Sequence, residues 1–280
     1  MNKTIILADS TCDLPERILK RHNIVMMPMY VCFGTASKKD GVDAFPEDVY
    51  DYYKKTNTVP TTAAIPPGDY ADVFAQYANQ GYAIIHIAIS SAISSCFQNS
   101  KIAAAEFEDV YPVDSKSLST GSGLVVLEAA RLIEEGFSAK EAAEKLTEFI
   151  EKVDASFVVD SLEFLKKGGR CSALAEFGAN LFKLKPCIEL VDGKMIPGKK
   201  YRGAIQSVIG TYIEERLAGK DVVDDIVFMT HSKSDPALVE AAREKLLSLG
   251  VFKVIEETDA GCTITAHCGE NTLGILFKLK

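Results

Sequence analysis

The sequence predicts an α/β protein of two domains, an N-terminal domain on a parallel sheet and a C-terminal α+β domain with a mixed or antiparallel sheet. Buried-strand patterns alternate with helical patterns in the first half, which is typical of a parallel sheet covered by helices. In the second half, Asp192-Gly193 separates two strand-like segments and indicates a hairpin, hence antiparallel pairing. A length of 280 residues allows two domains. We expect them at residues 1–154 and 155–280.

The first strand and the polar loop after it open the N-terminal domain. Thr4–Ala8 is a nearly continuous apolar run, as expected of a strand buried on both faces. Asp9–Asp13 follows it, and the spacing of Asp13 and Glu16 predicts a capping box at the start of a helix. The polar segment therefore lies in a strand-to-helix loop, at the sheet edge where open α/β sheets bind ligands.

The remainder of the first half continues the alternation of strands and helices. Residues 24–33 indicate a second strand region, with an edge or a bend at Pro28. Ser138 and Glu141 form a capping-box pattern and predict the start of a helix. The patterns predict strands at residues 83–89 and 110–113, and helices at residues 67–79, 98–107, 124–135 and 139–152.

From about Ala155 the sequence pattern differs from the alternation of strands and helices in the first half. Strands are expected at residues 157–159, 186–191 and 226–229. A helix begins with Pro236 at its first position and ends near Gly250. Residues 263–269 read as a strand that gives way to glycine, which places His267 in a loop at a strand end.

Composition and charge exclude several classes of function. The net charge of −8, from 31 basic and 39 acidic residues, argues against a nucleic-acid partner bound through a broad positive surface. No apolar run approaches the roughly 18 residues of a membrane span. The apolar run before Asp9 is too short for a signal peptide, so we expect a cytoplasmic location. Seven scattered cysteines without a Cys-x-x-Cys pair indicate reduced thiols.

Hydroxyl side chains gather beside the predicted strands and helix starts. Hydroxyls and backbone N–H groups at helix N-termini can bind a carboxylate or a phosphate, although each hydroxyl could instead simply cap its helix. Because several clusters meet at one predicted sheet edge, we expect a small anion site there. The residues concerned are Ser10, Thr11, Thr61, Thr62, Ser90, Ser91, Ser94 and Ser95.

Histidine and arginine supply further candidates. His267 can donate to an anion or stay neutral, or it can have a structural role. Arg170 and Arg202 lie in local basic segments of an acidic protein. They are either solvated loop charges or a docking patch for a phosphate-bearing ligand or partner. Cys262, His267 and Cys268 lack a second ligand pair at zinc spacing, so no metal is expected.

Four segments of the chain resemble the DegV family. They are residues 6–15 (Ile-Leu-Ala-Asp-Ser-Thr-Cys-Asp-Leu-Pro), 90–98, 157–170 and 266–269. The resemblance thus extends over nearly the whole chain. The sequence departs from the family pattern at Ala63–Pro66, at Ser95 where a glycine is usual, and at Glu270-Asn271.

The resemblance implies a bacterial fatty-acid-binding carrier rather than an enzyme, with no cofactor. Such a protein holds one long-chain fatty acid in a tunnel between its two domains. It presents the carboxylate to a separate fatty acid kinase that serves phospholipid metabolism, with at most transient membrane contact. Carried onto this chain, the ligand-binding residues are Thr62, Ser91, Ser94, Ser95 and His267, and the residues for phosphate or kinase docking are Arg170 and Arg202.

Two other functions remain open from the residues. One is a small-molecule hydrolase or transferase with Ser94 or Cys12 as the nucleophile. The chain has no Gly-x-Ser-x-Gly elbow and no phosphate-binding P-loop, which weighs against this alternative. The other is a structural or regulatory interaction module without a ligand.

Overall fold

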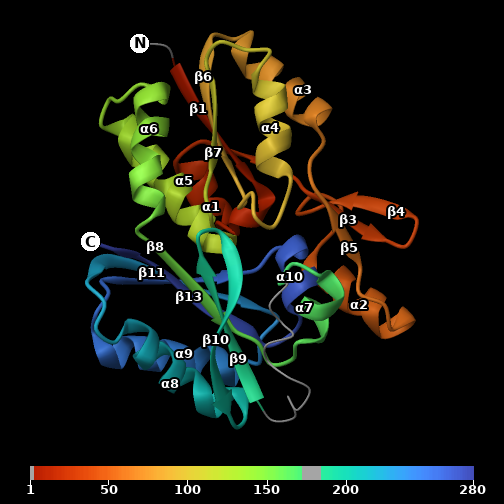
Figure 1. Cartoon of the computed structure of the whole chain (residues 1–280), viewed down its shortest axis with the longest axis vertical. Coiled ribbons are helices and arrows are strands. Elements are labelled where there is room, and N and C mark those ends of the chain that lie inside the picture. Colours follow the sequence, from red (N-terminus) through yellow and green to blue (C-terminus); the bar gives the residue numbers. More distant parts are fainter. Residues whose placement is uncertain (1–2, 172–183) are drawn as a thin grey trace.

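The N-terminal half is built on a four-stranded parallel sheet, as predicted. The computed structural model describes residues 3–171 and 184–280 and places this sheet in the upper part of Figure 1. In spatial order its strands are β2 (Ile24–Met27), β1 (Lys3–Asp9), β6 (Tyr82–Ala88) and β7 (Val110–Asp114), and each neighbouring pair is parallel.

Helices cover both faces of this sheet, which explains why its strands read as continuous apolar runs. Ile5 and Leu7 of β1 pack in a cluster with α3 (Pro67–Ala78) and α4 (Cys96–Ala104). Ile6 and Ala8 point the other way and pack with α5 (Ser119–Glu134) and α6 (Ala139–Ile150). The two helix pairs lie on opposite sides of the sheet in Figure 1. The Ser138–Glu141 capping box at the start of α6 is confirmed.

The C-terminal half is built on a mixed sheet of six strands, also as predicted. Its order is β10 (Lys194–Arg202), β9 (Leu184–Val191), β8 (Val153–Val158), β13 (Thr272–Leu279), β11 (Val222–Ser232) and β12 (Val254–Asp259). Only the β11–β12 pair is parallel. The Asp192-Gly193 hairpin is confirmed, with both residues at positive φ. Helices α8 (Ile205–Leu217) and α9 (Pro236–Leu249) pack on this sheet through a separate core.

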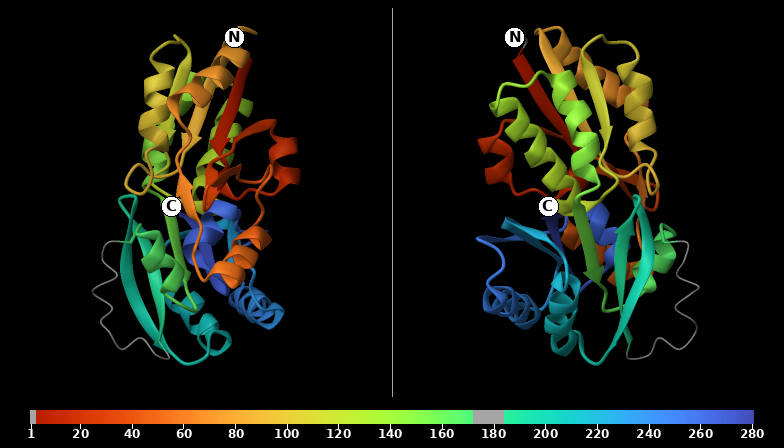
Figure 2. Two further views of the ribbon diagram at one scale, coloured as in Figure 1. Left: turned by 90° about the vertical axis from the view of Figure 1, so that its right-hand side faces the viewer. Right: turned by 60° about the vertical axis from the view of Figure 1, so that its left-hand side comes forward.

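A third sheet, which the sequence analysis did not predict, links the two halves. Pro28 separates β2 from β3 (Tyr30–Phe33), and β3 pairs with β4 (Ala36–Lys39) and β5 (Thr61–Ala63). Residues of this region and of α2 (Pro46–Thr56) pack with α7 (Glu163–Gly168) and α10 (Cys262–Cys268). Figure 2 shows α2 (orange) beside these C-terminal elements. The domain boundary at residue 155 stays a prediction.

Two local predictions were wrong. Helix α1 (Glu16–Arg21) follows Pro15 without a side-chain cap, because Asp13 accepts hydrogen bonds from Ser119 and Gly261 instead. His267 lies in the last turn of helix α10 and not in a loop. Six of the seven α10 residues are buried, so this helix has no polar face that would reveal a helical period.

Among the described residues, none of the helices combines the length and apolar character needed to cross a membrane.

Candidate ligand-binding site

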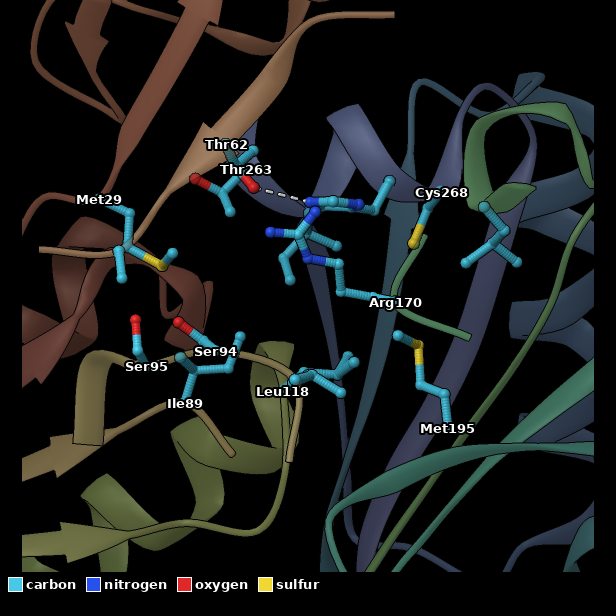
Figure 3. A pocket seen from close by; sticks show the side chains of 15 residues that line it. Met29, Thr62, Ile89, Ser94, Ser95, Leu118, Arg170, Met195, Thr263 and Cys268 are labelled. Carbon is cyan, nitrogen blue, oxygen red and sulfur yellow. Dashed lines mark hydrogen bonds between the residues drawn. The ribbon is translucent and has the colours of Figure 1, made fainter. Parts of the chain in front are cut away.

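A cavity of about 100 Å³ lies at the junction of the two halves. Its N-terminal wall comes from β5, from the β2–β3 connection and from the loop between β6 and α4, and its C-terminal wall comes from α7, β10 and α10. The lining residues are Met29, Thr62, Ala64, Ile89, Ile93, Ser94, Ser95, Leu118, Leu165, Arg170, Met195, Thr263, Ile264, His267 and Cys268. Figure 3 shows Ser94 and Ser95 across the cavity from Thr62 and Thr263. Five of the seven residues selected from the sequence therefore meet here.

His267 forms a hydrogen bond between the two walls of the cavity. Its Nε2 lies 2.8 Å from Oγ1 of Thr62, so α10 contacts β5 across the junction (Figure 3). Burial, with a smaller effect of the positive charge on Arg170, lowers the pKa of His267 to about 4. The imidazole is therefore neutral at pH 7 and offers one donor and one acceptor nitrogen. Its Nδ1 has no hydrogen-bond partner among the described residues.

Glycine is favoured at each of the two positions before Arg170, for a different structural reason. An ideal Cβ on Gly168 would lie 2.2 Å from Nδ1 of His267, so only glycine leaves room for the imidazole. Gly169 ends α7 at a φ of 66°, a left-handed conformation that glycine adopts without strain. The Gly-Gly pair therefore both ends the helix and admits His267.

Gly168→Ala should displace the His267 ring and break its bond to Thr62, at a cost of about 1–3 kcal/mol typical of overpacking. Nitrogen NMR of the imidazole together with thermal unfolding would measure both effects. Gly68→Ala is the matched control, because nothing lies within 4 Å of a Cβ there and the residue is helical. An unchanged His267 ring in Gly168→Ala would contradict this account of the motif.

Arg170 gives the cavity its positive charge. Its Nη1 donates to the Gly168 carbonyl at 2.8 Å, and it forms no ion pair with any described residue. Since His267 is neutral, Arg170 is the one cation among the described residues that line the cavity. A guanidinium that has no ion pair among the described residues and lies beside hydroxyl donors favours an anionic ligand.

The loop that carries Ser94 and Ser95 is anchored at its beginning. Asp9 accepts the Ile89 N–H at 3.0 Å, and the Ser90 hydroxyl donates to the Gly193 carbonyl of the β9–β10 hairpin at 2.7 Å. The loop is thus attached to both halves of the protein. Ser94 Oγ accepts a hydrogen bond from the backbone N–H of Cys96 and is not bonded to a histidine among the described residues.

The remaining predicted residues lie outside this cavity. Ser91 is exposed, and its hydroxyl donates to Asp114 at 2.5 Å. Arg202 is the exposed last residue of β10, whereas Met195, near the start of that strand, lines the cavity. Ser10 donates to Asp40. All the hydroxyl clusters were predicted to meet at one place. Of their residues, Thr62, Ser94 and Ser95 line this cavity.

A second, smaller cavity of about 30 Å³ adjoins the first. Both are lined by Leu118, Ile264 and Cys268, so these three side chains lie between the two cavities. The second cavity lies beside β8, β11 and β13, and its lining includes Ala155, Phe157, Leu190, Ala260 and Leu276. Its Ser156 and Thr230 hydroxyls are bonded to Tyr212, Thr120 and Thr258.

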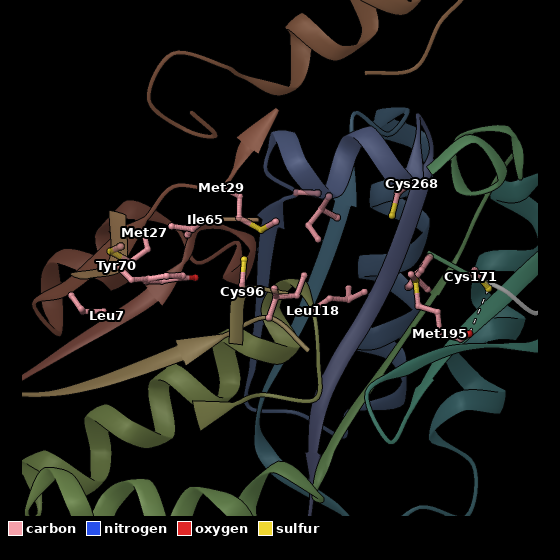
Figure 4. Close-up of a cluster of buried hydrophobic side chains, with 14 of the residues drawn as sticks. Leu7, Met27, Met29, Ile65, Tyr70, Cys96, Leu118, Cys171, Met195 and Cys268 are labelled. Carbon is pink, nitrogen blue, oxygen red and sulfur yellow. Dashed lines mark hydrogen bonds between the residues drawn. The ribbon is translucent and has the colours of Figure 1, made fainter. Parts of the chain in front are cut away.

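An apolar core surrounds the first cavity and crosses the junction. Figure 4 shows Leu118 between Met29 and Cys96 on one side and Met195 and Cys171 on the other. These side chains belong to one contiguous cluster that begins in the N-terminal sheet. The site thus has polar groups set into an apolar surrounding.

Sequence reasoning missed Thr263. This residue lines the cavity, is 2% exposed, and its Oγ1 has no hydrogen-bond partner among the described residues. It was missed because residues 263–266 read as a strand. Recognition of a buried helix there would have placed Thr263 and His267, four residues apart, on one face.

The alternative nucleophile Cys12 is poorly suited to that role. It is 1% exposed, and burial raises the pKa of its thiol to about 12, so it is protonated at neutral pH. No group of three or more metal-ligating side chains occurs in the part of the chain that the structure describes.

Comparison with known proteins assigns the chain to a family. A model of the DegV family matches residues 3–280. The chain belongs to the DegV family. A DegV domain-containing protein of Clostridium acetobutylicum is 34% identical, with both chains covered over their full lengths.

Solved structures of DegV family members share the fold. A structure described as fatty acid binding of a DegV family protein from Thermus thermophilus has a TM-score of 0.88 at 27% identity, covering 100% of both chains. A stearic-acid-binding protein from Eubacterium ventriosum has a TM-score of 0.84 at 25% identity, with 98% of each chain covered. The resemblance seen in the sequence is confirmed, and so is the two-domain α/β fold.

Proposed function

We propose that this protein binds one long-chain fatty acid at the junction of its halves, with the carboxylate in the first cavity and the acyl chain directed into the second. The observation that carries this is that the two cavities are neighbours and share Leu118, Ile264 and Cys268 in their linings. The first cavity offers Thr62, Ser94, His267 and an Arg170 that has no ion pair among the described residues, and the surface of the second cavity is mostly apolar. The DegV family protein described as binding a fatty acid and the similar stearic-acid-binding protein support the ligand class.

The head-group end can neutralise a carboxylate without a metal or another cofactor. Burial of an ionised carboxylate without partners would cost more free energy than burial of the acyl chain supplies. Hydroxyls of Thr62, Ser94 and Ser95 and a neutral His267 can donate to its oxygens, and Arg170 can balance its charge. These donors come from both halves, so binding would hold the two walls together.

The acyl chain supplies most of the gross binding energy. Sixteen carbons at roughly 0.8 kcal/mol per buried methylene give about 12 kcal/mol of favourable free energy. The entropy lost on association offsets several kcal/mol of this gain. The two cavities are smaller than the roughly 300 Å³ of a typical ligand site. The walls must therefore move apart as the chain enters. Met29 and Met195 have flexible thioether side chains, so they can change rotamer most easily to make room for the acyl chain.

We further propose that the protein is a carrier without catalytic activity of its own, which presents the bound carboxylate to a separate fatty acid kinase in the cytoplasm. Arg170 at the cavity and the exposed Arg202 on β10 are the proposed residues for meeting the phosphate or the kinase. Ser94→Ala should weaken lipid retention. Arg202→Ala should leave lipid retention unchanged and slow phosphorylation by the kinase. If both variants kept the lipid content and the phosphorylation rate of the native protein, the proposal would be contradicted.

Thr263→Val should have opposite effects on stability and on affinity. The buried Thr263 hydroxyl has no partner among the described residues, so a methyl group in its place should stabilise the lipid-free protein. If the hydroxyl donates to the carboxylate, affinity should fall by about 5- to 10-fold, equivalent to roughly 1 kcal/mol. Thermal unfolding and lipid titration measure the two effects.

Thr265→Val on the same helix is the matched control. The Thr265 hydroxyl donates to the Ala260 carbonyl, and the residue does not line the cavity. This variant should lose stability and keep its affinity. An affinity loss of the same size in both variants would contradict a direct contact between Thr263 and the ligand.

A further inference from the structure

The Asp9–Asp13 segment, which the proposed ligand contacts leave unexplained, is bonded to both walls of the first cavity. Asp9, Ser10 and Asp13 are all buried, and none of them lines that cavity. Asp40, at the end of β4, is buried beside them and accepts the Ser10 hydroxyl at 3.0 Å. Among their other hydrogen bonds are four that reach the start of the loop that carries Ser94 and the start of the helix that carries His267.

Asp9 anchors the serine loop. Its Oδ2 accepts the Ile89 N–H at 3.0 Å, and Ile89 begins the connection to Ser94. Its Oδ1 lies 2.7 Å from the Tyr70 hydroxyl and 3.0 Å from Nε2 of His86. The carboxylate is thus fixed by the α3 and β6 side chains, and it fixes the first peptide of the loop.

Asp13 and Asp40 together cap helix α10. The helix has no side-chain cap of its own, because Gly261 occupies the cap position. Gly261 N–H donates to Asp13 at 2.9 Å, while the N–H groups of Cys262 and Thr263 donate to Asp40 at 2.9 and 3.2 Å. Unpaired N–H groups at a helix start need acceptors, and negative charge there is favourable.

We propose that Asp9, Asp13 and Asp40 are positioning residues that set the separation between the serine loop and α10, and so fix Ser94 and His267 for one carboxylate. This inference rests on the proposed function. The two walls are joined because Ser10 links the segment to Asp40 and also accepts the Met29 N–H at 3.1 Å. A shift of α10 along its axis would directly change the 2.8 Å contact between His267 and Thr62.

Asparagine substitutions at positions 40 and 13 should differ in their effects. Asp40 accepts three hydrogen bonds with its two oxygens, so Asp40→Asn must lose at least one α10 amide bond. Asp13→Asn can keep its oxygen on Gly261 and turn its amide toward the Ser119 hydroxyl. Burial raises the pKa of the Asp13 carboxyl to about 8, so its neutral form is already accessible near pH 7.

The test compares these variants in lipid-free protein by nitrogen NMR of the His267 imidazole, and then by titration with palmitate. Asp40→Asn should shift the ring resonances and weaken palmitate binding by about 10-fold, a loss typical of one hydrogen bond. Asp13→Asn should stay near the native values in both measurements. Ser10→Ala, which leaves both α10 amide bonds of Asp40 but removes the Ser10–Asp40 bond and the acceptor of the Met29 N–H, should give an intermediate shift and serves if Asp40→Asn does not fold.

Ser138→Ala is the control for a general loss of stability, because it breaks the α6 capping box without touching either wall. An unchanged His267 ring in Asp40→Asn, or an equal palmitate loss in Ser138→Ala, would overturn the inference. The ring measurement needs no ligand. If the ring shifts but native protein takes up no palmitate, the positioning of His267 holds and the proposed function fails.

Discussion

Palmitate affinity should fall by about 100-fold or more when Cys268 is replaced by leucine. Cys268 is 6% exposed and, with Leu118 and Ile264, lies between the two cavities. An acyl chain that extends from the first cavity into the second must pass Cys268, and the larger leucine side chain would exclude the end of that chain. Exclusion of four methylenes removes about 3 kcal/mol at roughly 0.8 kcal/mol each. Acids short enough to end within the first cavity should bind as in the native protein.

A series of saturated acids from eight to eighteen carbons, titrated by calorimetry, would measure this effect. Cys187→Leu is the matched control, since Cys187 is buried in the C-terminal core and lines neither cavity. Both substitutions carry a similar overpacking cost of about 1–3 kcal/mol. An equal loss for every chain length in Cys268→Leu would contradict the proposed path of the acyl chain.

Lowering the pH from 6.5 to 4 should cost the lipid-free protein about 3 kcal/mol of unfolding free energy through His267. Burial lowers the pKa of this imidazole from 6.5 to about 4 in the folded state. Between these values the unfolded chain binds a proton that the folded chain does not bind, so acid favours unfolding. The effect is absent above pH 6.5, grows as the pH falls, and is constant below about 4.

Urea unfolding at a series of pH values would measure this contribution, with His267→Gln as the control. The other titrating groups are common to both proteins, so the difference between the profiles isolates His267. A bound carboxylate beside the imidazole should raise the pKa of His267 and reduce the loss. Identical pH profiles for native protein and His267→Gln would contradict the buried, neutral state of this histidine.

The features predicted correctly from the sequence have local signals. The β1 and β6 strands are continuous apolar runs, and the Asp192-Gly193 hairpin and the Ser138–Glu141 box are short patterns with defined geometry. Thr62, Ser94 and His267 were candidates from the residues themselves, and a resemblance that covers nearly the whole chain assigned them to ligand binding. Their meeting in one cavity is a property of the fold.

The features that were missed depend on partners far apart in the sequence. Asp13 has the spacing of a local cap, but it accepts an N–H group 248 residues away. Helix α10 is buried on nearly all sides and rich in β-branched residues, so its sequence resembles a strand. Strands β3, β4 and β5 are only three or four residues long, too short for a clear alternation.

Mass spectrometry of the purified protein, first under native conditions and then after organic extraction, tests the central claim most directly. A fatty acid held between the two halves predicts a mass increment of one such molecule, lost on extraction and recovered in the organic phase. The same experiment would identify the acyl chain. A bare mass, with no uptake after incubation with palmitate or oleate, would contradict the proposed function.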